Sequence, residues 1–431
     1  MRTRRYLRGK IYHHKFVYND QIFKFKTSFL ISIILILSST SIFFFYSQTH
    51  SLSHLNQISK ALSHRFPGTP INSNDAKIVW KSHSFLKHLS AFLIKSNHPP
   101  LGFSSSSYFS NLGFKSFHST YPKPDQIGPR PKKQWIRRLN YLKKLAINSH
   151  NLDLINSFAI PIAKLEPDGL VTYPSNLELG PGLNGVCSWE RTGCLRNSQN
   201  GYAQDLDIVD TDHQTWAVNF DDGPLPPSKS LYKLLDQFNT KATHFWIGGN
   251  VLIYWDLALT ADKRGDHLAV HTWSHSHLTS LSDEQVLGEL GWTIQIIFDL
   301  TGKIPKYFRP PYGNIDNRIR AIAKHVFGLE TVIWNEDSID WALNQTYSTG
   351  DQVDLPNPND APNLNQVIEN IKQFSIDDKI KLNGLLLLEH ELSQESVKAF
   401  EVSWKKVKDL GWKTGALPEC IEDGKAKWYQ N

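Results

Sequence analysis

Cysteine is scarce in this sequence, with three residues among 431. That number excludes a disulfide-dense scaffold and any zinc or iron–sulfur site built from four cysteines. No internal repeat is visible. Hydrophobic residues make up 40% of the chain, which is enough apolar material for a sizeable core and excludes a wholly disordered protein. The length allows two or three domains, or one large domain with extensions.

Net charge is almost absent from most of the chain. Residues 1–26 hold eight basic residues and one acidic residue, a net +7, which leaves −1 for the remainder of a chain whose total is +6. A nearly neutral body is a poor electrostatic partner for a polyanion, so we do not expect nucleic acid binding.

Charged residues are missing altogether from Thr27 to Tyr46. Twenty apolar helical residues span about 30 Å, the thickness of the bilayer hydrocarbon, and a basic flank stays cytoplasmic. We therefore expect a cytoplasmic tail over 1–26 and a signal-anchor over 27–46 in a type II membrane protein of the secretory pathway or cell surface. The alternative is a cleaved signal and secretion to the cell wall, but the long basic region favours the anchor.

Regular periodicity is weak between residues 47 and 185. We expect a largely irregular stem there, with a short helix near 132–147. A cysteine-containing segment over 186–214 leads into the main domain, and 416–431 form a tail without the hydrophobic run of a glycolipid anchor signal. The sequon Asn344-Gln345-Thr346 fits a glycoprotein facing the secretory lumen.

From residue 215 onward, short apolar runs alternate with segments of helical period. Strands are expected at 215–220, 242–247, 267–271, 306–309, 331–334 and 384–390. Helices are expected at 227–238, 251–263, 282–301, 316–327, 364–376 and 394–410, the third starting with a Ser282–Gln285 capping box. This alternation indicates parallel βα units. It favours a distorted (β/α) barrel, with a doubly wound sheet as the alternative.

Ionisable side chains follow five of these strands. They are Asp221 and Asp222, His271 and His275, Arg309 before Tyr312, Asp340 before Trp341, and His390. Because active sites gather at the carboxyl ends of parallel strands, we expect these residues to converge. The adjacent carboxylates can serve one site only if the strand bends between them.

These residue types suit metal-assisted hydrolysis of an amide or ester. One Asp and two His supply three ligands for Zn²⁺ or a similar ion, although His275 with His277 is a competing pair. A metal lowers the pKa of its water, a second carboxylate takes the proton, and a histidine protonates the leaving group. Backbone N–H groups near Tyr312 would stabilise the oxyanion.

In this order, FDDGP, HTWSH, RPPYG, DSIDW and LLLEHE resemble the five motifs of carbohydrate esterase family 4, the polysaccharide deacetylases with a NodB homology domain. The resemblance covers about 215–415 and is greatest to the fungal chitin deacetylase branch, notably in DSIDW and LEHEL. It implies a distorted (β/α)7 barrel. It also implies hydrolysis of N-acetyl groups from the N-acetylglucosamine residues of chitin, giving chitosan and acetate.

The resemblance also implies roles for single residues. Asp221 would be the general base, oriented by Arg309. Asp222, His271 and His275 would hold zinc, cobalt or another divalent ion, with His277 outside this set.

On the other side of the site, His390 would be the general acid, held and tuned by Asp340. The backbone N–H of Tyr312 would belong to the oxyanion site, and Trp341 and Leu388 would wall the acetyl pocket. Trp273 and Trp341 are candidates for stacking on sugar rings, because no separate cysteine-rich chitin-binding module is evident.

Two positions depart from the family pattern. Asn219 stands where Thr is frequent, and Glu391 where many members have Asp. Neither removes a catalytic group, so we expect an active enzyme. The alternatives are a deacetylase of another polysaccharide, such as xylan or peptidoglycan, and a silent carbohydrate-binding homologue. A glycosidase fits poorly, because adjacent carboxylates do not flank a glycosidic bond.

The cysteine pairing stays open at this level. Cys187 and Cys194 resemble a cysteine-bearing segment that precedes the domain in fungal members. A bridge between them would leave Cys420 free, but Cys420 is able to pair with either of them in an oxidising compartment. The oligomeric state is equally open.

Overall fold

The computed structural model describes residues 120–182, 184–343 and 362–430. They belong to one compact unit, Leu89–Asn431. The predicted tail, the predicted signal-anchor at 27–46 and the sequon at Asn344 lie outside the described residues. Within the described ranges, no helix combines the length and the apolar character that a membrane span requires.

A five-stranded parallel sheet forms one side of the domain, in the order β4-β5-β6-β7-β8. Its strands are β4 (Asn219–Asp221), β5 (Thr243–Trp246), β6 (His267–Val270), β7 (Tyr307–Phe308) and β8 (Glu330–Thr331). β4 to β7 are buried along their whole length, as expected for parallel strands covered on both faces.

The pairing continues around a ring. β9 (Glu336–Asp337), which follows β8 along the chain, pairs in parallel with β10 (Leu387–Leu388). Parallel bridges then join Leu385 to Trp216 and His390 to Asp221, which returns to β4. β11 (Lys413–Gly415) pairs in parallel with β3 (Thr215–Ala217). The parallel α/β architecture is confirmed, and the closing bridges favour the barrel over an open doubly wound sheet.

Side chains fill the interior of this ring. Ala217, Phe245, Ala269, Tyr307 and Leu386 come from successive strands and form one buried cluster. Small and large residues alternate around it, as in the packed centre of a parallel barrel. Leu417, Cys420 and Ile421 from the C-terminal segment belong to the same cluster.

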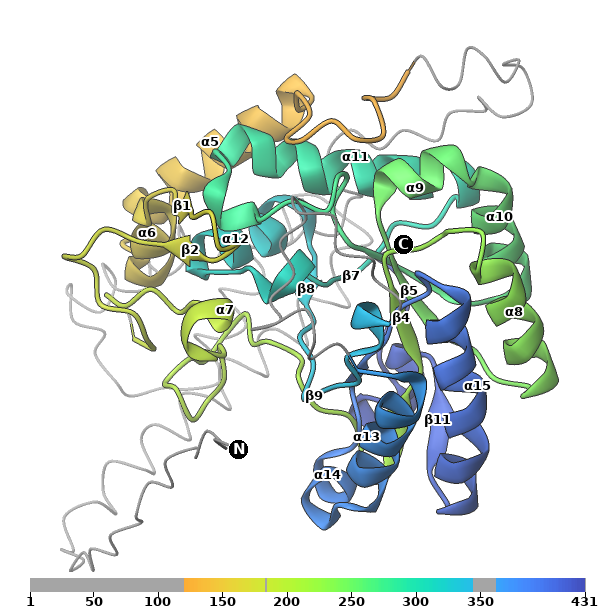
Figure 1. The fold of residues 1–431 in the computed structure, drawn as a ribbon. Coiled ribbons are helices and arrows are strands. Elements are labelled where there is room, and N and C mark those ends of the chain that lie inside the picture. The colour runs from red at the N-terminus through yellow and green to blue at the C-terminus, as the bar shows by residue number, and fades with distance from the viewer. Residues whose placement is uncertain (1–119, 183, 344–361, 431) are drawn as a thin grey trace, which may run out of the picture. The chain divides into compact units, whose positions relative to one another are not determined.

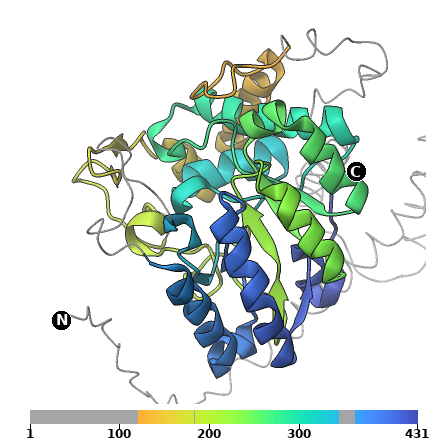
Figure 2. The same cartoon turned by 45° about the vertical axis from the view of Figure 1, so that its right-hand side comes forward.

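Helices lie outside the strands (Figures 1 and 2). They are α8 (Ser228–Gln237), α9 (Gly248–Ile253), α10 (Trp255–Arg264), α11 (Asp283–Thr301), α12 (Asn317–Ala321), α13 (Leu364–Ile376), α14 (Asp378–Asn383) and α15 (Gln394–Asp409). The predicted capping box of α11 is present, with Ser282 and Gln285 each bonding the other's backbone, and Gly302 ends the helix at φ 72°.

Short helical turns complete the chain. They are η3 (Leu278–Ser280), η4 (Pro311–Gly313), η5 (Ile322–Val326), η6 (Asp340–Ala342), η8 (Leu417–Glu419) and η9 (Glu422–Gly424). Two of them, η4 and η6, carry residues of the predicted site.

The described part of the predicted stem differs from the expectation. The helix near 132–147 is confirmed as α5 (Lys133–Asn148), but α6 (Leu152–Ala159) and the antiparallel pair β1 (Lys164–Leu165) and β2 (Val171–Thr172) follow it. Trp135, Leu139 and Leu142 of α5 are buried in the same cluster as the apolar residues of α11. Beyond the predicted helix, the expectation of an irregular chain is therefore wrong at α6, β1 and β2. The apolar stripe of α5, at helical spacing, packs this part of the chain on the domain.

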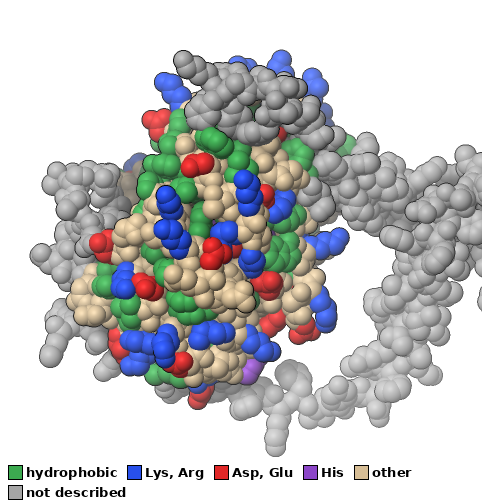
Figure 3. Space-filling model, turned by 90° about the vertical axis from the view of Figure 1, so that its right-hand side faces the viewer, with side chains coloured by type: hydrophobic (Ala, Val, Ile, Leu, Met, Phe, Trp, Pro, Cys, Tyr) green, Lys and Arg blue, Asp and Glu red, His purple; other side chains and the backbone are tan. Residues whose placement is uncertain are grey.

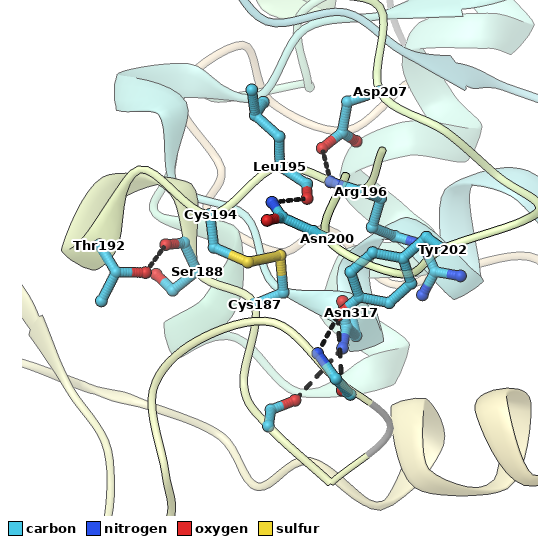
Figure 4. Close-up of a disulfide and its surroundings, with 12 residues drawn as sticks. Cys187, Ser188, Thr192, Cys194, Leu195, Arg196, Asn200, Tyr202, Asp207 and Asn317 are labelled. Carbon is cyan, nitrogen blue, oxygen red and sulfur yellow. Dashed lines mark hydrogen bonds between the residues drawn. A yellow bond between two sulfur atoms is a disulfide. The ribbon is translucent and has the colours of Figure 1, made fainter. Parts of the chain in front are cut away.

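A disulfide joins Cys187 and Cys194 (Figure 4). Cys420 is free and buried. The four-residue helix α7 (Trp189–Thr192) lies inside the closed loop. Arg320 donates hydrogen bonds to the carbonyl oxygens of both disulfide cysteines and forms an ion pair with Asp207. The local bridge, one of the open alternatives, is thus the pairing in this structure.

Basic and acidic side chains are interspersed over the face shown in Figure 3. This distribution agrees with a chain that is nearly neutral after its first 26 residues.

Candidate metal and catalytic site

Three predicted ligands meet at the carboxyl ends of β4 and β6. The ligand atoms of Asp222, His271 and His275 all lie within 4.8 Å of one another. The Nε2 atoms of His271 and His275 lie 3.3 Å and 3.1 Å from Asp222 Oδ1. Among the described residues, this is the group of acidic, histidine or cysteine side chains that is arranged to hold a metal ion.

The backbone turns sharply at each of the two strand ends. Asp221 is the last residue of β4, and Asp222 after it has φ 73°. After β6, Thr272 has φ 66° and His275 has φ 59°. The predicted bend therefore exists, and it allows adjacent carboxylates to face one site. The compact turn after His271 brings its partner four residues later onto the same carboxylate.

The donor set fits a divalent cation. His271 Nδ1 lies 2.8 Å from the carbonyl oxygen of Arg309, so this nitrogen carries a proton and donates it. In a neutral imidazole, Nε2 then presents a lone pair toward Asp222 Oδ1, which is buried and makes no well-aligned hydrogen bond. Lone pairs facing a carboxylate repel one another unless a cation lies between them.

His277 does not join this group. Its ring stacks on the ring of Tyr312, with centroids 4.1 Å apart. The Tyr312 hydroxyl lies 3.0 Å from His275 Nδ1, on the side of the imidazole opposite Asp222. The cluster therefore contains His271 with His275, as the resemblance implied, and excludes the competing pair.

A buried ion pair holds the predicted base. Arg309 Nη1 donates to Asp221 Oδ1 at 2.8 Å and to Asn219 Oδ1 at 2.5 Å. Arg309 is fully buried, and its guanidinium carbon lies 4.2 Å from the centroid of the Phe245 ring. The second Asp221 oxygen lies 3.9 Å from His271 Nε2, which places this carboxylate beside the metal ligands.

Asn219 is more than a departure from the family pattern. Its amide nitrogen donates to the carbonyl oxygens of Ala217 and Leu387, while its oxygen accepts from Arg309. It therefore holds the same guanidinium nitrogen, Nη1, that bonds Asp221.

His390 and Asp340 form the second predicted pair. Asp340 Oδ1 lies 2.7 Å from His390 Nδ1, and Asp340 Oδ2 accepts the backbone N–H of His390 at 2.9 Å. The parallel bridge between Asp221 and His390 brings this pair to the base. Burial alone would lower the pKa of His390, but Asp340, followed by Asp222 and Asp221, raises it to about 10.

The remaining predicted residues border the same strand ends. Tyr312, in η4, has φ 59°. Trp341, in η6, donates its indole N–H to Asp337 Oδ2 at 3.4 Å, and Leu388 ends β10 with 7% of its surface exposed. Their roles in an oxyanion site and an acetyl pocket stay predictions.

The expectation for Trp273 is wrong. Its side chain is fully buried, its ring stacks on Tyr121 at a centroid distance of 6.1 Å, and its indole N–H donates to the Lys123 carbonyl oxygen. A ring enclosed by the protein is not available to a sugar.

Two buried carboxylates near the site were not singled out from the sequence as parts of it. Glu391 Oε1 accepts from Trp246 Nε1 and lies 3.0 Å from His244 Nδ1. Glu289, on α11, bonds the loop between the two histidine ligands. Glu289 carried a sequence signal, because it is a lone charge among apolar residues in the middle of a long helix.

The strand ends of a parallel α/β barrel thus carry an Asp-His-His group, an Asp-Arg pair and a His-Asp pair. Comparison with known proteins adds a polysaccharide deacetylase family model that matches residues 208–331. Chitin deacetylase 1 of Saccharomyces cerevisiae is 38% identical over 240 residues, which cover 55% of this chain and 67% of that protein. The chain belongs to the polysaccharide deacetylase family.

Two further relatives were found. Chitin deacetylase 3 of Cryptococcus neoformans var. neoformans serotype D (strain JEC21) is 40% identical over 267 residues, or 61% of this chain; the match spans 58% of that protein's length. The solved structure of the chitin deacetylase from Colletotrichum lindemuthianum aligns with 53% of this chain and 96% of its own, at 20% identity and a TM-score of 0.45.

Proposed function

We propose that this chain is a metal-dependent deacetylase that removes N-acetyl groups from the N-acetylglucosamine residues of chitin, giving chitosan and acetate. The observation that carries the proposal is the convergence of the Asp222–His271–His275 group with Asp221 and His390 at one end of the barrel. The chitin substrate is supported by relatives named chitin deacetylase at 38% and 40% identity.

Asp222, His271 and His275 would hold the ion, with zinc as first choice and cobalt or another divalent ion as alternatives. When bound, such an ion lowers the pKa of water and polarises the acetamide carbonyl. Three protein ligands leave coordination positions open, as in catalytic zinc sites.

Asp221 is the proposed base. Arg309 donates to the Asp221 carboxylate, and Asn219 accepts from the same guanidinium nitrogen. The carboxylate therefore keeps one orientation beside the proposed metal ligands. From there it takes a proton from the attacking water as the new C–O bond forms.

His390 is the proposed acid. With a pKa of about 10 it is protonated at neutral pH, and the contact of Nδ1 with Asp340 directs the other ring proton, on Nε2, away from that carboxylate. This proton goes to the departing amine nitrogen as the C–N bond breaks, and the products are acetate and a free amine. The backbone N–H of Tyr312 would stabilise the oxyanion, and Trp341 and Leu388 would wall the acetyl group.

We further propose that residues 27–46 anchor the chain in the membrane, with the catalytic unit facing the secretory lumen or cell surface. The run of twenty uncharged residues behind a basic flank supports this orientation. A cell wall polymer would be within reach of an enzyme placed this way.

The substrate is tested by measuring acetate release from chitin oligomers, acetylated xylan and peptidoglycan, with the Asp221→Asn variant as control. Release from chitin oligomers that the variant lacks supports the proposal. Release from xylan or peptidoglycan alone would keep the chemistry and replace the substrate. No release from any of them by a protein that binds metal would indicate a silent binding homologue.

A further inference from the structure

A buried carboxylate outside the five motifs contacts the loop that carries both histidine ligands. Glu289 lies on α11, and its side chain is fully buried. Its Oε2 accepts the backbone N–H groups of Trp273 at 2.8 Å and Ser274 at 2.9 Å, and its Oε1 accepts the Ser274 hydroxyl at 2.7 Å. Trp273 and Ser274 are two of the three residues between His271 and His275.

The loop held in this way has an unfavourable backbone conformation. Thr272 and His275, on either side of the two bonded residues, both have left-handed φ values, 66° and 59°. For a β-branched residue such as threonine, that conformation is a genuine outlier and persists only when its surroundings impose it. The Thr272 hydroxyl accepts the His275 N–H within the loop. From outside the loop, Glu289 accepts the backbone N–H groups of Trp273 and Ser274. The N–H groups of Gly248 and Gly249 donate to the carbonyl oxygens of Thr272 and Trp273.

A third element reaches the same carboxylate. The strap, defined as residues 120–132, runs along α11 ahead of α5 (Figure 1). Gly128 donates its N–H to Glu289 Oε1 at 2.7 Å. The strap also covers Trp273, whose indole N–H donates to Lys123 and whose ring stacks on Tyr121. The approach to α11 is close, because a Cβ added to Gly288 would lie 1.7 Å from the Pro129 carbonyl oxygen.

We propose that Glu289 is a positioning residue: by joining α11, the strap and the 272–275 loop, it fixes the spacing of His271 and His275 and so sets the affinity of the site for its divalent cation. This inference rests on the proposed metal site. It goes beyond the residues assigned by the motifs, because Glu289 bonds Gly128, Trp273 and Ser274 and is not one of the three proposed ligands.

The chemistry of the contacts requires a carboxylate. All four groups that face Glu289 are donors, and an ionised carboxylate accepts at both oxygens. A glutamine of the same shape accepts at one oxygen and turns an N–H toward donors at the other. Replacing a residue that orients metal ligands without binding the metal itself typically changes metal affinity roughly 10–100-fold.

The test compares zinc binding by the full chain, carrying no metal, in the wild type, Glu289→Gln and Asp299→Asn. Asp299 is the matched control, because it is a second carboxylate on α11 that accepts from the strap through Tyr121 but does not bond the loop. Binding of Zn²⁺ is measured by competition with a chromophoric chelator. The visible absorption of bound Co²⁺, which reports ligand geometry, is recorded for each protein.

We expect Glu289→Gln to weaken zinc binding roughly 10–100-fold and to alter the cobalt spectrum, while Asp299→Asn stays within about threefold of the wild type. A folded Glu289→Gln protein with wild-type zinc affinity and cobalt spectrum would overturn the inference. If that variant does not fold, Glu289→Asp decides, since its shorter side chain keeps the charge but cannot bond the loop and the strap together. Unchanged affinity there also overturns it. A wild type that binds no zinc would instead overturn the proposed metal site.

Discussion

Two histidine–carboxylate pairs in this molecule use neighbouring residues of the chain, His390 and Glu391, which follow strand β10. His390 pairs with Asp340 at 2.7 Å, and the next residue, Glu391, pairs with His244 at 3.0 Å. In both pairs burial lowers the histidine pKa and the neighbouring carboxylate reverses this, so that both pKa values rise to about 10.

The pairs differ in what surrounds the second ring nitrogen. His244 Nε2 lies 3.7 Å from Asp266 Oδ2, so this imidazole sits between two carboxylates and is fully buried. His390 is joined to Asp221 by a parallel bridge and keeps 7% of its surface exposed. The same kind of pair is structural at His244, where both ring nitrogens lie near carboxylates, and is the proposed acid at His390, where Asp340 contacts one ring nitrogen.

Removing His390, the proposed acid, gives the largest expected effect. His390→Ala should lower kcat about 10²–10⁴-fold, the usual contribution of a general acid. Steady-state acetate release measures this loss. Zinc affinity should stay close to that of the wild type, because His390 is not a ligand. A variant with wild-type kcat would contradict the assignment of the acid.

Removing the structural member should act on stability instead. His244→Ala leaves Glu391 and Asp266 buried without their shared partner, and a broken buried ion pair typically costs about 3–5 kcal/mol. Urea unfolding measures the change in unfolding free energy. Under conditions where the variant is folded, its kcat should fall far less than that of His390→Ala. The comparison fails if the two variants lose stability and activity in equal proportion.

A milder change separates the tuning of His390 from its presence. In Asp340→Asn the carboxylate that raises the His390 pKa is gone, so the pKa falls. The alkaline limb of kcat should move roughly 1–3 units toward lower pH, the range expected for loss of an adjacent opposite charge. The pH dependence of kcat measures this shift. An unchanged alkaline limb would show that another group controls it.

The smallest expected effect is the pH dependence of stability from the structural pair. The folded pKa of His244, about 10, lies above its ordinary value of 6.5. Its stabilisation is therefore complete below about pH 6.5 and is lost as the pH rises toward 10. Urea unfolding of the wild type and His244→Gln should show a stability difference that shrinks between pH 6 and pH 10. A constant difference would show that His244 is not charged in the folded protein.

The sequence predicted which side chains lie together where those residues directly follow parallel strands. The rule that parallel strands end at one edge was enough to bring Asp221, Asp222, His271 and His275 together. The need for a bend between the two aspartates also followed from strand geometry, and Asp222 indeed has φ 73°.

Long-range packing was beyond the same reasoning. Trp273 belongs to the HTWSH motif and was expected to stack on sugar rings, but the strap, some 150 residues earlier in the chain, covers it. The apolar stripe of α5 could be read from the sequence, but its burial against α11 depends on the position of α11 in the folded domain. The Cys187–Cys194 pairing likewise depends on Cys420 being enclosed in the barrel core.

The central claim is that the Asp-His-His group holds a divalent ion on which deacetylation depends. The most direct test measures acetate release from chitin oligomers by the purified protein, after chelation, and after Zn²⁺ is added back, with Asp222→Ala treated identically. The account predicts activity that chelation abolishes and zinc restores in the wild type, and no restoration in the variant. Acetate release that survives complete removal of metal would contradict it.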